Sequence, residues 1–257
     1  MTAQRFLMKV AYDGTDFGGW QVQKHQRTVQ SVLQKALYEF SGHKTPVIGS
    51  GRTDAGVHAW GQYAHFDYRG TATAEQMQKG LKRFLPPDVQ ILKIIPVPPD
   101  FHARYDAMER CYQYIITLKP TPFNRLYEGS FPRKKIRIEL MQKAAPFFLG
   151  THDFSSFSKE NPAVPDHVCT VVQSDFEIYQ DRYIYTIRAD RFLHNMVRRI
   201  VGALVNIGHF DLEPSIVETW LQQKQARQTI IFPAPPQGLY LMDVHYPEEK
   251  LNPGLLK

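Results

Sequence analysis

Cysteine is scarce in this chain of 257 residues, which contains only Cys111 and Cys169. The two lie far apart in the sequence and neither belongs to a CxxC pair, so their spacing argues against a disulfide framework and against a structural zinc site. We expect both to be small buried residues of strands, where free cysteine is usually found. The histidines also lack HxxxH or HExxH spacing, and we therefore predict no metal site.

Long apolar runs are absent as well. No stretch approaches the ~18 consecutive apolar residues that a membrane-spanning helix needs, so we expect no membrane partner. Near the N-terminus, Arg5 and Lys9 interrupt a short strand-like pattern at the place where a signal peptide would need its apolar core. These features predict a cytoplasmic protein.

Charge of neither sign dominates strongly. Lys and Arg number 31 against 25 Asp and Glu, which gives a formal net charge of +6. Such a balance suits a polyanion partner but fits ordinary solubility equally well, so the position of the charges has to decide. Hydrophobic residues make up 43% of the chain, enough for the core of one large domain or two small ones.

The order of predicted elements is that of a split βαβ unit in the first half of the chain. Thr28 and Thr73 are the expected N-caps of two helices, the second of which should end at Pro86. The expected strands cover residues 5–12, 45–48, 62–68 and 89–97. The resulting order β-α-β-β-α-β is the ferredoxin-like plan.

The same rhythm restarts after Pro98 and Pro99. We expect strands at 111–118, 168–179, 183–189 and 238–246, and helices at 138–149, 192–207 and 214–225, with Pro146 shortening the first helix. The fold class predicted is α+β, with two ferredoxin-like (RRM-like) halves in one continuous, mainly antiparallel sheet. Helices should cover one face and a basic cleft the other. The predicted subdomains are residues 1–104 and 105–257.

The helix expected at 192–207 has a wide apolar face and a polar stripe. Arg191, His194, Asn195 and Arg198 recur at steps of three and four residues, which would place them together near the start of the helix. The stripe fits either a solvated surface or a basic wall of a cleft.

The stretch GSGRTDAGVHAW, residues 49–60, places Arg52 and Asp54 two positions apart on a glycine-rich turn. In extended backbone both side chains would project to the same side. An arginine at that range keeps a carboxylate ionised, as a nucleophile requires. A structural salt bridge on the turn is the alternative. A glycosidase would need a second positioned carboxylate, and Asp67 lies in a later strand where either face is open to it.

This stretch resembles the signature of the TruA-type tRNA pseudouridine synthases. Five further blocks follow the order of that family and extend the resemblance over nearly the whole chain: VAYDGTDFGGWQVQ (10–23), FHARYDAMERCYQY (101–114), GTHDFSSF (150–157), FLHNMVRRIVG (192–202) and GLYL (238–241).

The resemblance implies an isomerase that converts uridine to pseudouridine in tRNA. By that resemblance Asp54 is the catalytic aspartate, attacking either the base at C6 or the sugar at C1′, and Arg52 helps to displace the target base. Tyr112 packs against the uracil, and Arg198 lies near the aspartate. Further expected RNA contacts come from residues within the matched blocks, namely His58, Arg104, Arg110 and Arg199.

The resemblance also implies partners and sites. The expected substrate is the tRNA anticodon stem-loop at positions 38, 39 and 40, with the target base flipped out of its stack. The reaction involves no net redox change and no hydrolysis, so we expect no cofactor. The short chain resembles the bacterial type, which implies a homodimer. Lys82, Cys111 and Cys169 depart from the family pattern, which makes the expected RNA-contact surface unusual.

A non-catalytic RNA-binding protein with the same fold is the main alternative. Binding alone needs no lone carboxylate among phosphates, because its negative charge would only repel RNA. The intact Arg52, Asp54, Tyr112 and Arg198 therefore favour the enzyme.

Overall fold

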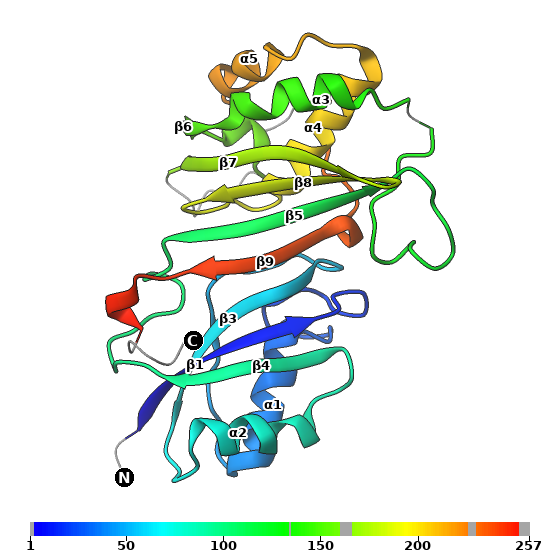
Figure 1. Ribbon diagram of the computed structural model, residues 1–257. Helices are drawn as coiled ribbons and strands as arrows, with labels where there is room; N and C mark the ends of the chain where they lie inside the picture. The colour runs from blue at the N-terminus through cyan, green and yellow to red at the C-terminus, as the bar shows by residue number, and fades with distance from the viewer. Residues whose placement is uncertain (1–2, 134, 160–165, 226–229, 252–257) are drawn as a thin grey trace. The chain divides into compact units, whose positions relative to one another are not determined.

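A computed structural model describes residues 3–133, 135–159, 166–225 and 230–251 (Figure 1). The chain divides into two compact units. The first comprises Met1–Met108 together with Leu241–Lys257, and the second comprises Glu109–Tyr240. The predicted subdomains 1–104 and 105–257 were defined by the motifs that they carry, and that assignment stays a prediction.

The first unit follows the predicted order of elements. These are β1 (Gln4–Tyr12), α1 (Val29–Ser41), β2 (Ile48–Gly49), β3 (His58–Tyr68), α2 (Ala74–Leu81) and β4 (Val89–Pro96), joined by the end of β9 (Leu239–His245). Strand β1 lies between β4 and β3, β2 pairs with the outer part of β3, and all three pairings are antiparallel.

Both helices of the first unit begin where their threonine caps predict. Thr28 and Ser31 form a capping box at α1, and Gly42, with a φ of 72°, ends that helix in the left-handed conformation. Thr73 caps α2 in the same way. This helix ends at Leu81 and continues as a 3-10 turn over Lys82–Phe84, so it is shorter than predicted.

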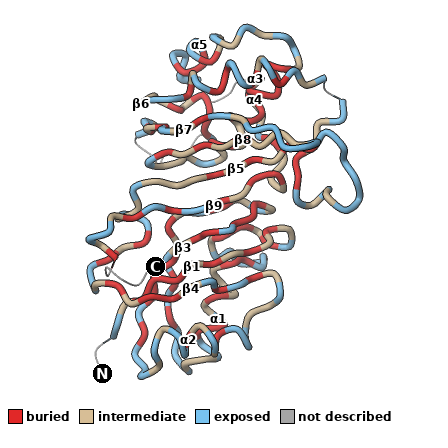
Figure 2. Tube along the Cα trace, in the orientation of Figure 1, coloured by how far each residue is buried: buried red, intermediate tan, exposed pale blue. Residues whose placement is uncertain are grey.

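The core of the first unit lies between strands and helices. Buried residues run along β1 and β3 (Figure 2), and α1 contributes the stripe Val29, Leu33, Ala36 and Leu37. Helix α1 contacts α2, and α2 packs against β4. The exposed ends of the strands carry ion pairs, of which Arg5 with Asp67 is bidentate at 2.8 and 3.0 Å.

The second unit is also built from antiparallel strands and helices, in the order β5-β8-β7-β6 across its strands. Its elements are β5 (Glu109–Thr117), α3 (Ile138–Ala144), β6 (Gly150–Asp153), β7 (Val168–Tyr179), β8 (Arg182–Ala189), α4 (Met196–Phe210) and α5 (Ile216–Gln223). Short 3-10 turns cover Ala145–Phe148, Ser155–Phe157, Pro236–Gly238 and, in the first unit, Glu248–Lys250. The α+β class with mainly antiparallel strands is thus confirmed. One parallel bridge joins Ile116 to Gly129.

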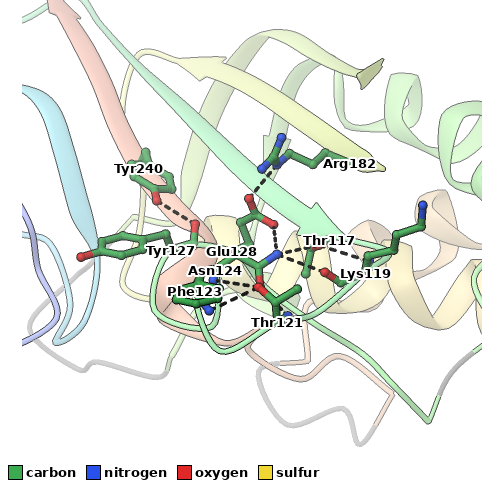
Figure 3. A network of polar contacts seen from close by, with 9 residues as sticks. All are labelled: Thr117, Lys119, Thr121, Phe123, Asn124, Tyr127, Glu128, Arg182 and Tyr240. Carbon is green, nitrogen blue, oxygen red and sulfur yellow. Dashed lines mark hydrogen bonds and ion pairs between the residues drawn. The ribbon is translucent and has the colours of Figure 1, made fainter. Parts of the chain in front are cut away.

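The side chain of Asn124 anchors the loop that follows β5 through hydrogen bonds (Figure 3). The Asn124 side-chain nitrogen, with two hydrogens to donate, lies within hydrogen-bonding distance of the Thr117 hydroxyl, the Lys119 carbonyl and the Glu128 carboxylate, at 3.2, 3.1 and 2.9 Å. Arg182 of β8 in turn donates to Glu128 at 2.6 Å. These bonds tie the loop to the ends of β5 and β8.

The helix predicted at 192–207 begins later than expected. Helix α4 starts at Met196 because Asn195 adopts a left-handed φ of 63°, which the periodicity of the apolar residues does not reveal. Arg191 and His194 therefore precede the helix, and the predicted polar stripe with Arg198 on one helix face is wrong. Pro146 shortens α3 as predicted, whereas β6 was not predicted at all.

Candidate active site

Asp54 lies on a turn between β2 and β3, and the first half of that turn is bonded to β3. The Ser50 hydroxyl is 2.5 Å from the Gln62 carboxamide oxygen, and the Ser50 amide donates to the Tyr63 carbonyl at 2.7 Å. The other end of the Gln62 carboxamide donates to the Gly51 carbonyl at 3.2 Å. Gln62 is fully buried, so these bonds fix the path of the backbone that leads to Asp54.

The backbone on either side of Asp54 is held by the segment that follows β1. Trp20 N–H donates to the Thr53 carbonyl at 3.1 Å, and the Tyr12 and Thr53 hydroxyls are 2.8 Å apart. Gly56 N–H donates to the Phe17 carbonyl at 3.3 Å. Burial raises the pKa of the Tyr12 phenol, so this hydroxyl keeps its proton and its bond to Thr53 at neutral pH.

Two glycines make this close approach of backbones feasible. A Cβ on Gly14 would overlap the carbonyl of Val57, and a Cβ on Gly19 would lie 2.6 Å from the Thr53 carbonyl oxygen. Gly19 also has a φ of 95°, which other residues rarely adopt. Two sequence blocks separated by 25 residues, 10–23 and 49–60, thus fold into one structure around Asp54.

His58, the first residue of β3, binds the segment that follows β1. Its Nδ1 accepts from the Gly14 amide at 3.0 Å and lies 3.1 Å from the Asp13 carboxylate. The side chain is 3% exposed. Because an accepting nitrogen carries no proton, the bond from Gly14 belongs to the neutral imidazole, whereas a proton on Nδ1 would bond Asp13 instead. Burial favours a positioning role for His58, and its predicted contact with RNA stays a prediction.

The remaining candidates of the first unit are less buried. Arg52 is exposed and Asp54 is half-buried on the same turn. Arg104 is exposed on the loop between β4 and β5. Asp67 lies on the far part of β3, where it is paired with Arg5, so it offers no positioned acid of the kind that glycoside hydrolysis needs.

Tyr112 and Arg110 lie on β5 of the second unit. The Tyr112 ring is 9% exposed and meets the Phe192 ring edge to face, with the centroids 5.1 Å apart. Arg110 Nη1 donates to the Asp190 carbonyl at 2.6 Å. Phe192 and Asp190 both belong to the stretch that leads from β8 into α4, so β5 and this stretch bring these residues together.

Arg198 sits in the first turn of α4 and is bonded through its own guanidinium. Its Nε donates to the Ala234 carbonyl at 2.7 Å, and its Nη1 donates to the Asn195 side-chain oxygen at 3.2 Å. The Ala234 amide returns a bond to the Arg198 carbonyl at 2.9 Å. Neighbouring Arg199 is half-buried, and this burial lowers its pKa below the usual value for arginine.

The positioning residues were not predicted from the sequence. Tyr12, Gly14 and Gly19 lie in a matched block, so their place in the sequence was visible while their contact with the Asp54 turn was not. Asn195 was expected near Arg198, but its left-handed backbone was not predicted, and Ala234 gave no signal because its carbonyl accepts independently of residue type.

Within the described ranges, no cluster of three or more His, Cys, Asp or Glu residues has the geometry to hold a metal ion. Over the same ranges, no helix is both long enough and apolar enough to cross a membrane. Cys169 is buried in β7 and Cys111 half-buried in β5, both in strands as predicted.

A carboxylate on a turn whose neighbouring backbone is held by other segments is an arrangement that enzyme active sites use. The sequence pattern of the tRNA pseudouridine synthases matches residues 8–106 and 144–247. The chain belongs to this family, within its TruA branch, and is an isomerase that acts on tRNA.

Similar relatives match along nearly their whole length. The tRNA pseudouridine synthase A of Bacteroides fragilis is 40% identical over 252 residues, which cover 97% of this chain and 99% of the relative. The protein of that name from Lacticaseibacillus casei is 41% identical over 249 residues, covering 94% and 99%. The one from Shouchella clausii is 41% identical over 246 residues, covering 94% and 93%.

Proposed function

We propose that this protein converts uridine to pseudouridine at positions 38, 39 and 40 of the tRNA anticodon stem-loop, with Asp54 as the catalytic residue. The observation that carries the proposal is the support around Asp54, in which two of the family-like blocks fold together to position one carboxylate. Structural support of this kind around one carboxylate is typical of a group that takes part in the reaction.

The reaction that we propose is balanced without a co-reactant. The bond between ribose C1′ and uracil N1 breaks, the base turns, and a new bond forms between C1′ and C5. The proton lost from C5 is matched by the proton gained at N1. Asp54 would attack either C6 of the base or C1′ of the sugar, and both routes need the carboxylate in its ionised form.

The other candidate residues have roles in the same proposal. Arg52 would displace the target base from its stack, Tyr112 would pack against the uracil, and Arg198 would support the ionised Asp54. RNA phosphates would be contacted by Arg104, Arg110 and Arg199. A basic cleft that brings these groups of the two units to one substrate is part of the proposal.

The fold is consistent with this proposal. In the first unit, the strand order β4-β1-β3-β2 with antiparallel pairs and two helices is the order of a ferredoxin-like half. We propose that the second unit is the matching half. Because tRNA is the substrate, we also place the enzyme in the cytoplasm.

We propose a homodimer. Light scattering at micromolar concentration should then give about 59 kDa, twice the 29.7 kDa of one chain. A single species near 30 kDa would contradict the dimer without touching the catalytic proposal.

The site of modification is tested by chemical mapping of pseudouridine in an unmodified tRNA transcript with uridines at positions 38–40. We expect new pseudouridine at these positions only, and none in a matched transcript with cytidine there. Pseudouridine elsewhere in both transcripts would overturn the proposed substrate position.

A further inference from the structure

The loop between β4 and β5, residues 101–108, is bonded to the rest of the first unit at several points. The Ala103 amide donates to His65 Nδ1 on β3 at 3.0 Å, and the Tyr246 hydroxyl donates to the Ala103 carbonyl at 2.6 Å. Arg5 of β1 donates to the Phe101 carbonyl at 2.9 Å. The 101–108 loop is therefore a fixed part of this unit.

His102 organises the exposed part of the 101–108 loop. Its Nδ1 accepts from the Arg104 and Tyr105 amides at 3.2 and 3.3 Å, and its own amide donates to the Asp106 carboxylate at 2.7 Å. Its ring centroid is 4.8 Å from that of His65. Burial lowers the pKa of both imidazoles, so both remain acceptors at neutral pH.

Tyr105 presents an open aromatic ring on this support. Its ring stacks on His102 with centroids 4.3 Å apart and planes 29° apart, while 76% of the residue is exposed. The guanidinium carbon of Arg104 lies 5.8 Å from the ring centroid. An exposed ring that is stacked on a neighbouring imidazole and has a guanidinium within cation–π range is an arrangement on which unpaired bases stack and phosphates bind.

The carboxylates near this ring already have cationic partners. Lys250 lies 3.4 Å from the Asp100 carboxylate and 3.8 Å from that of Asp106. Asp67 is paired with Arg5. Lys250 and Arg5 offset two of these three negative charges, so the loop repels a phosphate backbone less than bare carboxylates would.

The 101–108 loop contacts β3 away from the end of the strand that carries His58. Its contact residue, His65, lies seven positions beyond His58, the first residue after the Asp54 turn. At ~3.3 Å per strand residue the separation is roughly 20 Å. The loop is therefore attached at a different part of β3 from the end that carries His58.

We propose that Tyr105 and Arg104 form a second RNA-binding site, which takes an unpaired nucleotide of the tRNA other than the target uridine. The base stacks on the open face of Tyr105 and the phosphate binds Arg104. The identity of the RNA rests on the proposed function, whereas the stacking site rests on the geometry of the loop.

The test is the affinity for the tRNA transcript with cytidine at positions 38–40, which binds without turnover. Stacking on one aromatic ring accounts for roughly ten-fold or more in affinity. We expect Tyr105→Ala to raise the dissociation constant about ten-fold, and Tyr105→Phe, which keeps the ring, to stay close to the wild type. Arg104→Ala should weaken binding and lower the salt slope by about one.

Tyr38→Ala is the matched control, because Tyr38 is an exposed aromatic of α1 in the same unit. Its affinity should equal that of the wild type.

Three results would overturn the second site. The first is wild-type affinity in Tyr105→Ala, and the second is an equal loss in Tyr105→Ala and Tyr105→Phe. The third is a change in oligomeric mass with unchanged RNA affinity, which would show that the ring contacts a second copy of the chain. Absence of pseudouridine formation by the wild type would instead refute the proposed function and leave the affinity comparison intact.

Discussion

Asp54 and Arg198 are positioned by opposite means. Asp54 is positioned through its neighbouring backbone, which is held by hydrogen bonds at Thr53 and Gly56 and by the close approach of glycine residues. Arg198 is held through its own guanidinium, which donates to the Ala234 carbonyl and the Asn195 side chain. The position of Asp54 is therefore sensitive to changes in the neighbouring backbone, whereas the position of Arg198 is sensitive to changes in its own side chain.

The largest expected structural effect comes from Gly14→Ala. The new methyl group would overlap the Val57 carbonyl, and backbone cannot move aside as a flexible side chain can. We expect a loss of about 3 kcal/mol or more in the free energy of unfolding, measured in urea, with loss of turnover. Gly51→Ala is the control, because among the described residues no atom beyond its two chain neighbours lies within 4 Å of the place that its methyl group would take, and stability should be nearly unchanged. Equal stability of the two variants would refute the role of close approach.

Acid should loosen the first unit through His65. Burial, with smaller contributions from His102 and Arg5, lowers the pKa of His65 to about 4, while Asp67 and Asp106 oppose the shift. The unfolded chain takes up this proton near pH 6.5, so stability is complete above that pH and falls as the pH drops toward 4. The loss is at most about 3 kcal/mol. Urea unfolding across this range should show it, and His65→Gln should reduce the slope. The same slope in both proteins would contradict the assignment.

Arg198→Lys tests whether Arg198 depends on the hydrogen bonds of its own guanidinium. Lysine keeps the positive charge but cannot reproduce two directed bonds from one planar group. We expect a single-turnover rate of pseudouridine formation lowered by about ten-fold or more, with stability reduced by roughly 1 kcal/mol. An unchanged rate would show that charge alone matters at this position.

Tyr12→Phe should have the smallest effect. It removes the hydroxyl that lies 2.8 Å from the Thr53 hydroxyl and leaves the ring packing in place. We expect a loss of about 1 kcal/mol in the free energy of unfolding and a modest fall in turnover. Thr53→Val in the Tyr12→Phe background should add little, since the two changes remove the same bond. Additive losses would place the two hydroxyls in separate interactions.

The sequence predicted the elements better than their contacts. Threonine caps and apolar stripes identified α1 and α2, since both signals are local. The start of α4 was misplaced because Asn195 takes a left-handed conformation that no periodicity reports. The short strand β6 was missed because four residues carry too little pattern.

In the candidate site, too, residues were predicted better than their contacts. Asp54 could be chosen because its turn resembles a family signature, whereas its support by Tyr12 and Gly19 depends on how two distant segments pack. His58 was expected to contact RNA, yet its burial against Gly14 was not foreseeable from the motif alone. Packing between blocks is the information that the linear sequence does not display.

The most direct test of the account is single-turnover conversion of unmodified tRNA by Asp54→Asn at saturating enzyme. Asparagine keeps the shape of the side chain and removes the ionised oxygen, so the support around the turn should survive. We expect tRNA affinity close to the wild type and no detectable pseudouridine. Conversion at the wild-type rate would show that this carboxylate does not perform the chemistry.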